Sequence, residues 1–184
     1  GSTLNEPAYL RLPVDPLIAA LKDNVLTVRR AAAWALGRLG PRLDAARRGL
    51  PVEALVLALR DPQPEMREMA AAALGRLGEG RAIRPLVATL EDENAGVRKN
   101  AAEALEALGW HPSTQSEQAA YYIAIQNWER VPAIGSAVVD PLIRNMQDRN
   151  PEVRKAAALA LGRAGSSRAI DPLVQALHDP DTQV

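Results

Sequence analysis

Residues 85–109 read PLVATLEDENAGVRKNAAEALEALG, and the same pattern returns along most of the chain. A Pro-Leu anchor opens the unit, an aspartate follows seven positions later, and a Val-Arg pair precedes an alanine-rich run that ends in glycine. The anchors fall at positions 16, 54, 85, 141 and 172, with Ala54 in place of proline in the second, so that the shortest spacing is 31 residues. A fixed period of this length predicts an array of structural repeats.

Each repeat is predicted to fold as two helices. The anchor proline belongs in the first turn of a short first helix, where a missing N–H group is harmless. The second helix should begin three residues after the aspartate, at Pro64 and Pro151 in two repeats, and Asn94 and Asn150 are good N-caps. Its end falls at a glycine suited to a left-handed cap, and these glycines are Gly40, Gly78, Gly109 and Gly165.

The second helices are rich in small residues, in a chain with 34 alanines and 24 leucines. In the first repeat the expected apolar stripe consists of Val28, Ala31, Ala32, Ala35, Leu36 and Leu39. A single helix pair cannot bury such a stripe alone, so the repeats are expected to stack.

At this point the chain resembles the HEAT-repeat family, and in particular its short 31-residue variety found in phycobilin lyase subunits. The resemblance lies in the anchor, the aspartate, the Val-Arg pair, the Ala-Leu-Gly-Arg-Leu-Gly ending at 35–40 and 73–78, and Arg-Ala-Ile at 81–83 and 168–170. It implies an all-α fold, an α-α superhelix (HEAT/armadillo-type α-solenoid) of about five helical pairs. A helical insertion is expected between the third and fourth pairs.

We expect a single repeat domain over 1–184, with an expression scar at 1–2. The expected repeats are 14–40, 51–78, 81–109, 137–165 and an incomplete 168–184, with the insertion at 110–136. The sequence stops at Val184, where the pattern calls for an arginine and a further helix, so we expect either a protein cut within a repeat or further residues beyond Val184.

The repeated aspartate and arginine resemble the stacked hydrogen-bond ladder of such families. A carboxylate can accept from a helix N-terminus and from a neighbouring guanidinium. A polar ligand-binding track is the alternative. The ladder residues are Asp23, Arg29, Asp61, Arg67, Asp92, Arg98, Asp148 and Arg154.

Two segments depart from the period. Residues 41–49 are interpreted as a lengthened surface loop or, because of Arg42, Arg47 and Arg48, as a basic contact loop. The insertion contains a capping-box pattern at Thr114 and Glu117. It also holds four of the six aromatic residues, which indicate either a small core of its own or a binding site.

Composition argues against several kinds of chemistry. The chain has no cysteine and only two histidines, His111 and His178, so no metal site and no cofactor are expected. The 22 basic and 22 acidic side chains cancel, which argues against nucleic-acid binding. No apolar run is long enough for a membrane span, no signal peptide is visible, and we expect a cytoplasmic protein.

The outward positions of the second helices are predicted to line the concave face of the solenoid. We call them the second-helix face, and they are Arg30, Trp34, Arg38, Glu68, Arg76, Lys99, Glu103, Glu106, Lys155, Leu159 and Arg163. Trp34 between two arginines is a candidate hot spot, since both residue types are enriched there. Packing of Trp34 against an adjacent helix is the alternative, and an alternation of Arg and Glu is also typical of a solvated face.

The expected function is a non-catalytic protein-binding scaffold whose partner is another protein. One alternative, from the resemblance, is a subunit of a bilin lyase or a chromophore chaperone. A second is an engineered or fragmentary repeat protein without its own activity, against which the irregular spacings argue. We also expect that the incomplete fifth repeat allows oligomer formation.

Overall fold

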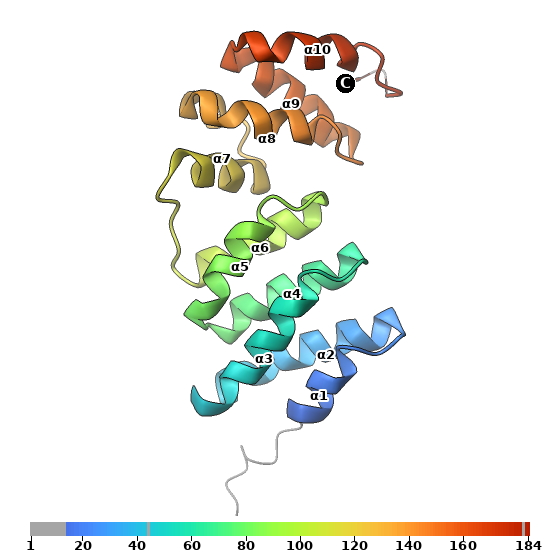
Figure 1. Ribbon diagram of the computed structural model, residues 1–184, viewed down its shortest axis with the longest axis vertical. Coiled ribbons are helices and arrows are strands. Elements are labelled where there is room, and N and C mark those ends of the chain that lie inside the picture. Colours follow the sequence, from blue (N-terminus) through green and yellow to red (C-terminus); the bar gives the residue numbers. More distant parts are fainter. Residues whose placement is uncertain (1–13, 44, 182) are drawn as a thin grey trace, which may run out of the picture. The chain divides into compact units, whose positions relative to one another are not determined.

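The computed structural model describes residues 14–43, 45–181 and 183–184, so the expected scar at 1–2 lies outside the described residues. Within these ranges the chain forms ten α-helices and no β-strand (Figure 1). The predicted all-α fold is therefore confirmed. Two compact units are present: Gly1–Leu86 with Glu103–Trp110, and Val87–Ala102 with His111–Val184.

The helices follow the repeats in pairs. The first three pairs are α1 (Val14–Ala20) with α2 (Leu26–Leu39), α3 (Ala45–Ala58) with α4 (Pro64–Leu77), and α5 (Ile83–Thr89) with α6 (Ala95–Ala107). After them come α7 (Gln115–Ala124), α8 (Val139–Asn145), α9 (Pro151–Ala164) and α10 (Ile170–Ala176). Short 3-10 turns lie at Gly40–Arg42, Gly80–Ala82, Pro132–Ile134, Ser136–Val138 and Ser167–Ala169.

The predicted helix starts are confirmed. The anchor proline is the third residue of α1, α5, α8 and α10, where its missing N–H costs no helical bond. The second helices α2, α4, α6 and α9 each begin three residues after the repeat aspartate. The predicted N-caps also form, because Asn94 Oδ1 accepts from the N–H of Val97 and Asn150 Oδ1 from that of Glu152.

The glycine ends agree with prediction in three repeats and differ in the first. Gly78, Gly109 and Gly165 have φ values of 72°, 70° and 65°, as expected for left-handed caps. For Gly40 the prediction was wrong, because its φ is −46° and the chain continues into the turn Gly40–Arg42. Glycine is needed there for a different reason: a Cβ atom would lie 3.2 Å from Leu77 Cα.

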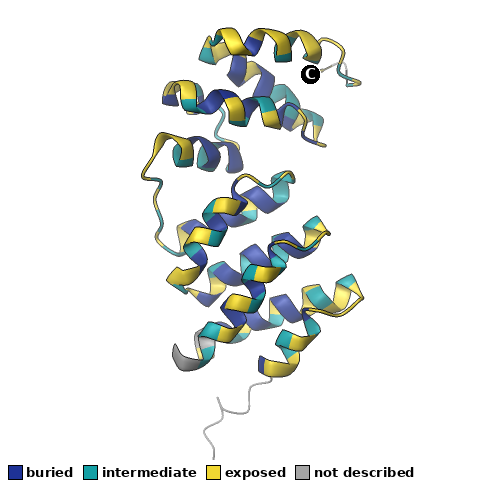
Figure 2. Ribbon diagram, viewed as in Figure 1, coloured by how far each residue is buried: buried dark blue, intermediate teal, exposed yellow. Residues whose placement is uncertain are grey.

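Small residues let the second helices of the first unit pack closely, with α2 against α4. A Cβ atom on Gly37 would lie 3.0 Å from Ala73 Cα, and one on Gly75 would lie 2.8 Å from Ala104 Cα. Figure 2 shows the buried stripes of these helices. The close approach explains why the period favours glycine and alanine at these positions.

The predicted stripe of α2 was wrong at its N-terminal end. Val28 and Ala31 are exposed, whereas Ala32, Ala33 and Leu36 are buried. The matching valine is buried in the third and fourth repeats. The repeat pattern therefore identifies helix positions correctly, but the contacts available to the first repeat decide which of them are covered.

The segment 41–49 is largely helical, which corrects its interpretation as a loop. After the turn Gly40–Arg42, α3 begins at Ala45 and runs through Pro51, so it has 14 residues where α1 has 7. Alanine and arginine are strong helix formers, and they extend the helix toward its N-terminus although Pro51 removes one backbone hydrogen bond. The side chain of Arg48 lies outside the described residues.

The insertion forms α7, which starts with the predicted capping box. Thr114 Oγ1 accepts from the N–H of Glu117, and Glu117 Oε2 accepts from the N–H of Thr114. The insertion has no separate core, however. Ala119 and Ile123 join a buried cluster with Leu142 of α8 and residues of α9, and Tyr122 and Trp128 pack against it. The expectation of a separate core was therefore wrong.

Candidate functional site

The repeat aspartates close the turn that follows the first helix of each repeat. In each described turn the carboxylate Oδ1 accepts from the backbone N–H two residues later, at distances of 2.8–2.9 Å. The five aspartates are Asp23, Asp61, Asp92, Asp148 and Asp179. A side chain that satisfies this N–H fixes where the second helix begins.

The repeat arginines bind the same turns from the following helix. In all four repeats, Nη1 donates to the carbonyl oxygen of the aspartate at 2.9–3.0 Å and to that of the next residue at 3.1–3.4 Å. The four arginines are Arg29, Arg67, Arg98 and Arg154. One guanidinium edge therefore holds the arginine to its own repeat.

In two repeats the opposite guanidinium edge binds both carboxylate oxygens of the aspartate in the next repeat. Arg29 binds both carboxylate oxygens of Asp61, at 2.9 and 3.1 Å. Arg154 binds both oxygens of Asp179, at 2.8 and 2.7 Å. The sequence-predicted set omitted Asp179, although its spacing from Pro172 identified it. A bidentate contact, in which one guanidinium donates two parallel hydrogen bonds to one carboxylate, is both strong and geometrically specific.

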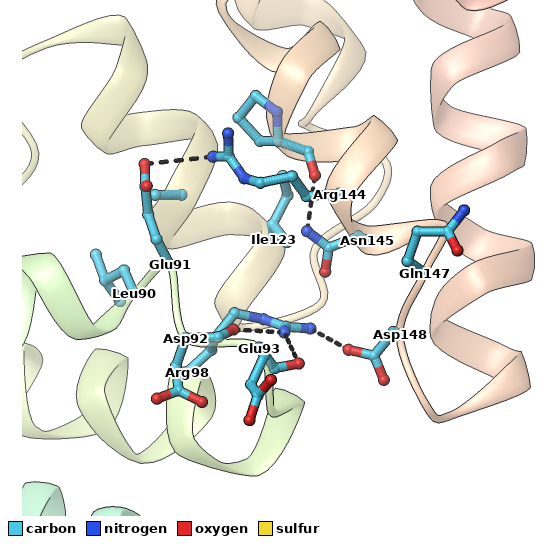
Figure 3. A pocket seen from close by; sticks show the side chains of 12 residues that line it. Leu90, Glu91, Asp92, Glu93, Arg98, Ile123, Arg144, Asn145, Gln147 and Asp148 are labelled. Atoms are coloured by element: carbon cyan, nitrogen blue, oxygen red, sulfur yellow. Dashed lines mark hydrogen bonds and ion pairs between the residues drawn. The ribbon is translucent and has the colours of Figure 1, made fainter. Parts of the chain in front are cut away.

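The pair of Arg98 and Asp148 is different, because only Nη2 bonds to the carboxylate, at 2.8 Å to Oδ2. Both side chains are buried, with exposed fractions of 5% and 4%. Among the described residues no hydrogen-bond partner is present for Arg98 Nε or for Asn145 Oδ1. Both residues line a cavity of about 330 Å³ in the second unit, drawn in Figure 3.

The residues of the second-helix face are all at least partly accessible. They lie on α2, α4, α6 and α9, where Glu68 and Lys155 are half-buried and the other nine are exposed. Trp34 is 50% exposed, so half of its surface stays accessible, and packing of its covered half against an adjacent helix stays the alternative to a hot spot. The guanidinium carbon of Arg38 lies 5.5 Å from the centre of the Trp34 ring, within cation–π range.

Family models match this chain over most of its length. A model described as HEAT repeats matches residues 52–125 and 117–184, and a second, described as HEAT repeat, matches residues 14–43. The chain belongs to the HEAT-repeat family. The resemblance in the sequence is thereby confirmed.

Solved structures similar to this chain include a chain in the complex of CpcE and CpcF of phycocyanin lyase from Nostoc sp. PCC7120. It is 27% identical with a TM-score of 0.50, and the match covers 98% of this chain and 75% of that chain. An engineered protein is 24% identical with a TM-score of 0.45, covering 92% and 74%. A designed armadillo repeat protein for modular peptide recognition is 23% identical with a TM-score of 0.40, covering 91% and 76%. No curated protein matches the chain.

Arg154 and Asp179, the last ladder pair among the described residues, change each other's pKa. Hydrogen bonds from Arg154 lower the pKa of Asp179, and the same bonds raise the pKa of Arg154. In the insertion, the backbone N–H of Ser113 lowers the pKa of Glu117. In each case the hydrogen bonds favour the charged form.

The two histidines of this HEAT protein, His111 and His178, are exposed. In the described part of the chain, no group of three or more His, Cys, Asp or Glu side chains is placed to hold a metal ion. No helix there is long and apolar enough to cross a membrane.

Proposed function

We propose that this HEAT-repeat chain is a non-catalytic protein-binding module that presents its second-helix face to a protein partner. Repeat arrays bury a continuous core and leave an extended surface for recognition. The observation that carries the proposal is the half-exposed Trp34 with Arg38 beside its ring. Exposing a large aromatic side chain to water is unfavourable in the free protein, and burying it against a partner would recover that free energy.

Affinity capture from cells that contain the protein tests this function. We expect Trp34→Ala and Arg38→Glu to lose a protein that the wild type retains. Leu57→Ala is the matched control, because Leu57 is also an exposed apolar residue, at 66%, but lies on α3. Retention of every partner by both Trp34→Ala and Arg38→Glu, with their melting temperatures unchanged, would defeat the proposal.

A second candidate function is a role as a subunit of a bilin lyase or as a chromophore chaperone. It is favoured by the match to the chain in the CpcE and CpcF complex, which extends over 98% of this chain. Mixing the protein with a linear tetrapyrrole should then shift the absorption spectrum of the pigment. An unchanged spectrum at protein excess would remove this candidate and leave the scaffold proposal standing.

The oligomer and the cytoplasmic location expected from the sequence stay predictions. For association between copies, α10 offers the exposed apolar side chains Ile170 and Val174, and Leu177, which follows the helix, is also exposed. Sedimentation velocity over a range of protein concentrations would detect such an association.

A further inference from the structure

The fifth repeat leaves an open groove beside α9 in the second unit. The groove has a volume of about 700 Å³ and is bounded by α9, by α10 and by the turn that follows α10. Its lining includes Leu159, Gly162 and Arg163 of α9, Leu173 of α10, and Leu177 and Asp181 of the turn. Figure 2 shows how much of α10 is exposed.

The groove exposes leucines at positions that the other repeats bury. Leu177 is 82% exposed, whereas the residue at the same position of the other four repeats is 1–7% exposed. These four residues are Leu21, Leu59, Leu90 and Met146. In each of those repeats a second helix follows the first, and in the described fifth repeat none does. The groove is therefore the place that a second helix fills in the other repeats.

Gly162 shows what a helix in this groove must carry. Gly37 and Gly75 hold the same position in the first two repeats, where a Cβ atom would lie 3.0 Å from Ala73 Cα and 2.8 Å from Ala104 Cα. Both alanines come six residues after the arginine of their own repeat. A Cβ atom on Gly162 would meet nothing within 4 Å. A helix that packs here in the same way needs a small residue opposite Gly162.

The charges at the two ends of the groove favour one direction of this helix. Asp181 lies in the turn, at the end of α9 where Arg154 binds Asp179. Arg163 comes nine residues after Arg154, about 14 Å further along α9. A helix has a partial positive charge at its N-terminus and a partial negative charge at its C-terminus. A helix parallel to α9 would bring these ends to Asp181 and to Arg163.

The turn also offers two acceptors that bind an arginine in the other repeats. In those repeats, Nη1 of the repeat arginine donates to the carbonyl oxygens of the aspartate and of the residue after it. In the fifth repeat the matching carbonyls belong to Asp179, which is half-buried, and to Pro180, which is exposed. No arginine in the described part of the chain donates to them. A basic side chain in the first turn of the added helix would find both.

We propose that this groove binds one amphipathic helix of the protein partner, with a basic residue in its first turn and alanine or glycine six residues later. Its apolar face covers Leu173 and Leu177, its small residue packs on Gly162, and its basic residue binds the turn. An amphipathic helix in an apolar groove is a common mode of recognition. The inference rests on the proposed protein-binding function and names the segment of the partner.

Two further observations support a single helix as the occupant. Helix α4 fills the equivalent place in the first unit, against α2 and α3, and its Ala70, Ala73 and Leu74 are fully buried there. A second copy of this chain fits less well through its own first repeat, because its α2 is packed against α1, and that α1 would need the place that α10 occupies.

A peptide from the chain itself is a suitable probe. Residues 67–77, REMAAAALGRL, begin with the repeat arginine of α4 and carry Ala73 six residues later. The probe is this peptide, N-acetylated and labelled with fluorescein at its C-terminus, and the control is the same peptide with Ala73→Leu. We expect the fluorescence anisotropy of the probe to rise saturably with protein concentration. The control should bind at least about tenfold more weakly, because its leucine meets the backbone of α9.

A matched pair of protein variants locates the binding site on α9. Gly162→Leu should keep the melting temperature of the wild type or raise it, because the added side chain meets open space and leucine is the better helix former. It should weaken probe binding at least about tenfold by filling the groove. Glu152→Leu places the same side chain at an exposed position of α9 outside the groove lining. It should bind the probe within about twofold of the wild type.

Three results of these titrations would overturn the proposal. They are no saturable binding to the wild type, equal binding of the two peptides, and binding to Gly162→Leu as tight as to the wild type.

Affinity capture tests whether a partner supplies the helix. Gly162→Leu should lose a protein that Glu152→Leu retains. Probe binding together with retention of every captured protein by Gly162→Leu would overturn the proposal, because the groove then has another occupant. Self-association of the wild type that Gly162→Leu abolishes would assign the groove to a second copy and would also overturn it.

The outcome is separable from that of the protein-binding proposal. Failed probe binding with loss of a partner on Trp34→Ala would keep the second-helix face and remove only the groove. Probe binding, and a partner lost on Gly162→Leu but not on Trp34→Ala or Arg38→Glu, would support the groove and remove the role of Trp34.

Discussion

Arg29 and Asp61 join the first two repeats by a two-point contact, with Nε to Oδ2 at 2.9 Å and Nη2 to Oδ1 at 3.1 Å. Both side chains are nearly buried, with exposed fractions of 13% and 12%. Asp61 Oδ1 also accepts from the N–H of Gln63 at the start of α4. One carboxylate therefore both closes a turn and links two repeats.

Removal of this carboxylate should destabilise the protein more than removal of one that only closes a turn. Asp23 is the matched control, because the described structure shows its carboxylate bonded only to the N–H of Val25. We expect Asp61→Ala to lower the free energy of unfolding by about 2 kcal/mol more than Asp23→Ala, since it leaves a guanidinium without its partner. Thermal melting followed by circular dichroism measures both.

The same reasoning predicts that Asp92→Ala lowers the melting temperature without altering binding at the second-helix face. An unchanged melting temperature in both Asp61→Ala and Asp92→Ala would contradict the structural role of the ladder and favour a ligand-binding track.

Gly75 and Gly162 occupy the same position of the repeat but have different surroundings. A Cβ atom on Gly75 would lie 2.8 Å from Ala104 Cα, whereas one on Gly162 meets nothing within 4 Å. We expect Gly75→Ala to destabilise by about 1–3 kcal/mol through overpacking. Gly162→Ala should stabilise by about 0.5–1 kcal/mol, because alanine is the better helix former. Chemical denaturation distinguishes the two, and equal effects would show that the close approach does not matter.

Acid should weaken the contact between Arg154 and Asp179. Hydrogen bonds from Arg154 lower the pKa of Asp179 in the folded protein, while an unfolded aspartate titrates near 3.9. The stabilisation is therefore fully present above about pH 4 and is lost as the pH falls through the lower folded value. The melting temperatures of the wild type and of Asp179→Asn should be measured from about pH 2.5 to about pH 7, on both sides of the unfolded pKa. The two melting temperatures should converge at the acidic end. A constant difference would contradict this assignment.

Local chemistry explains why so much of the fold could be predicted from the sequence. The starts of α4 and α9 follow from an aspartate, a proline and the fixed distance between them, and these act within a few residues. The capping box of α7 could be predicted for the same reason, because Thr114 and Glu117 are only three residues apart. The ladder positions recur with the period, and the resemblance to the HEAT-repeat family implied that these aspartates and arginines bond between repeats.

What could not be predicted depends on contacts between distant residues. Gly40 is glycine because Leu77 is close to it, which its own neighbours in sequence do not reveal. The insertion shares a core with α8 and α9 because Ala119 and Ile123 meet Leu142 there. The cavity at Arg98 arises where that insertion interrupts the ladder, and only the structure brings Asn145 to it.

The affinity of a captured partner for the wild type and for Trp34→Ala tests the central claim most directly. If Trp34 anchors the interface, the variant should bind at least about 30-fold more weakly, corresponding to a hot-spot loss of about 2 kcal/mol. Leu57→Ala should bind within about twofold of the wild type, as a surface residue outside the interface would. A Trp34→Ala protein with an unchanged melting temperature that binds the partner as tightly as the wild type would contradict the account.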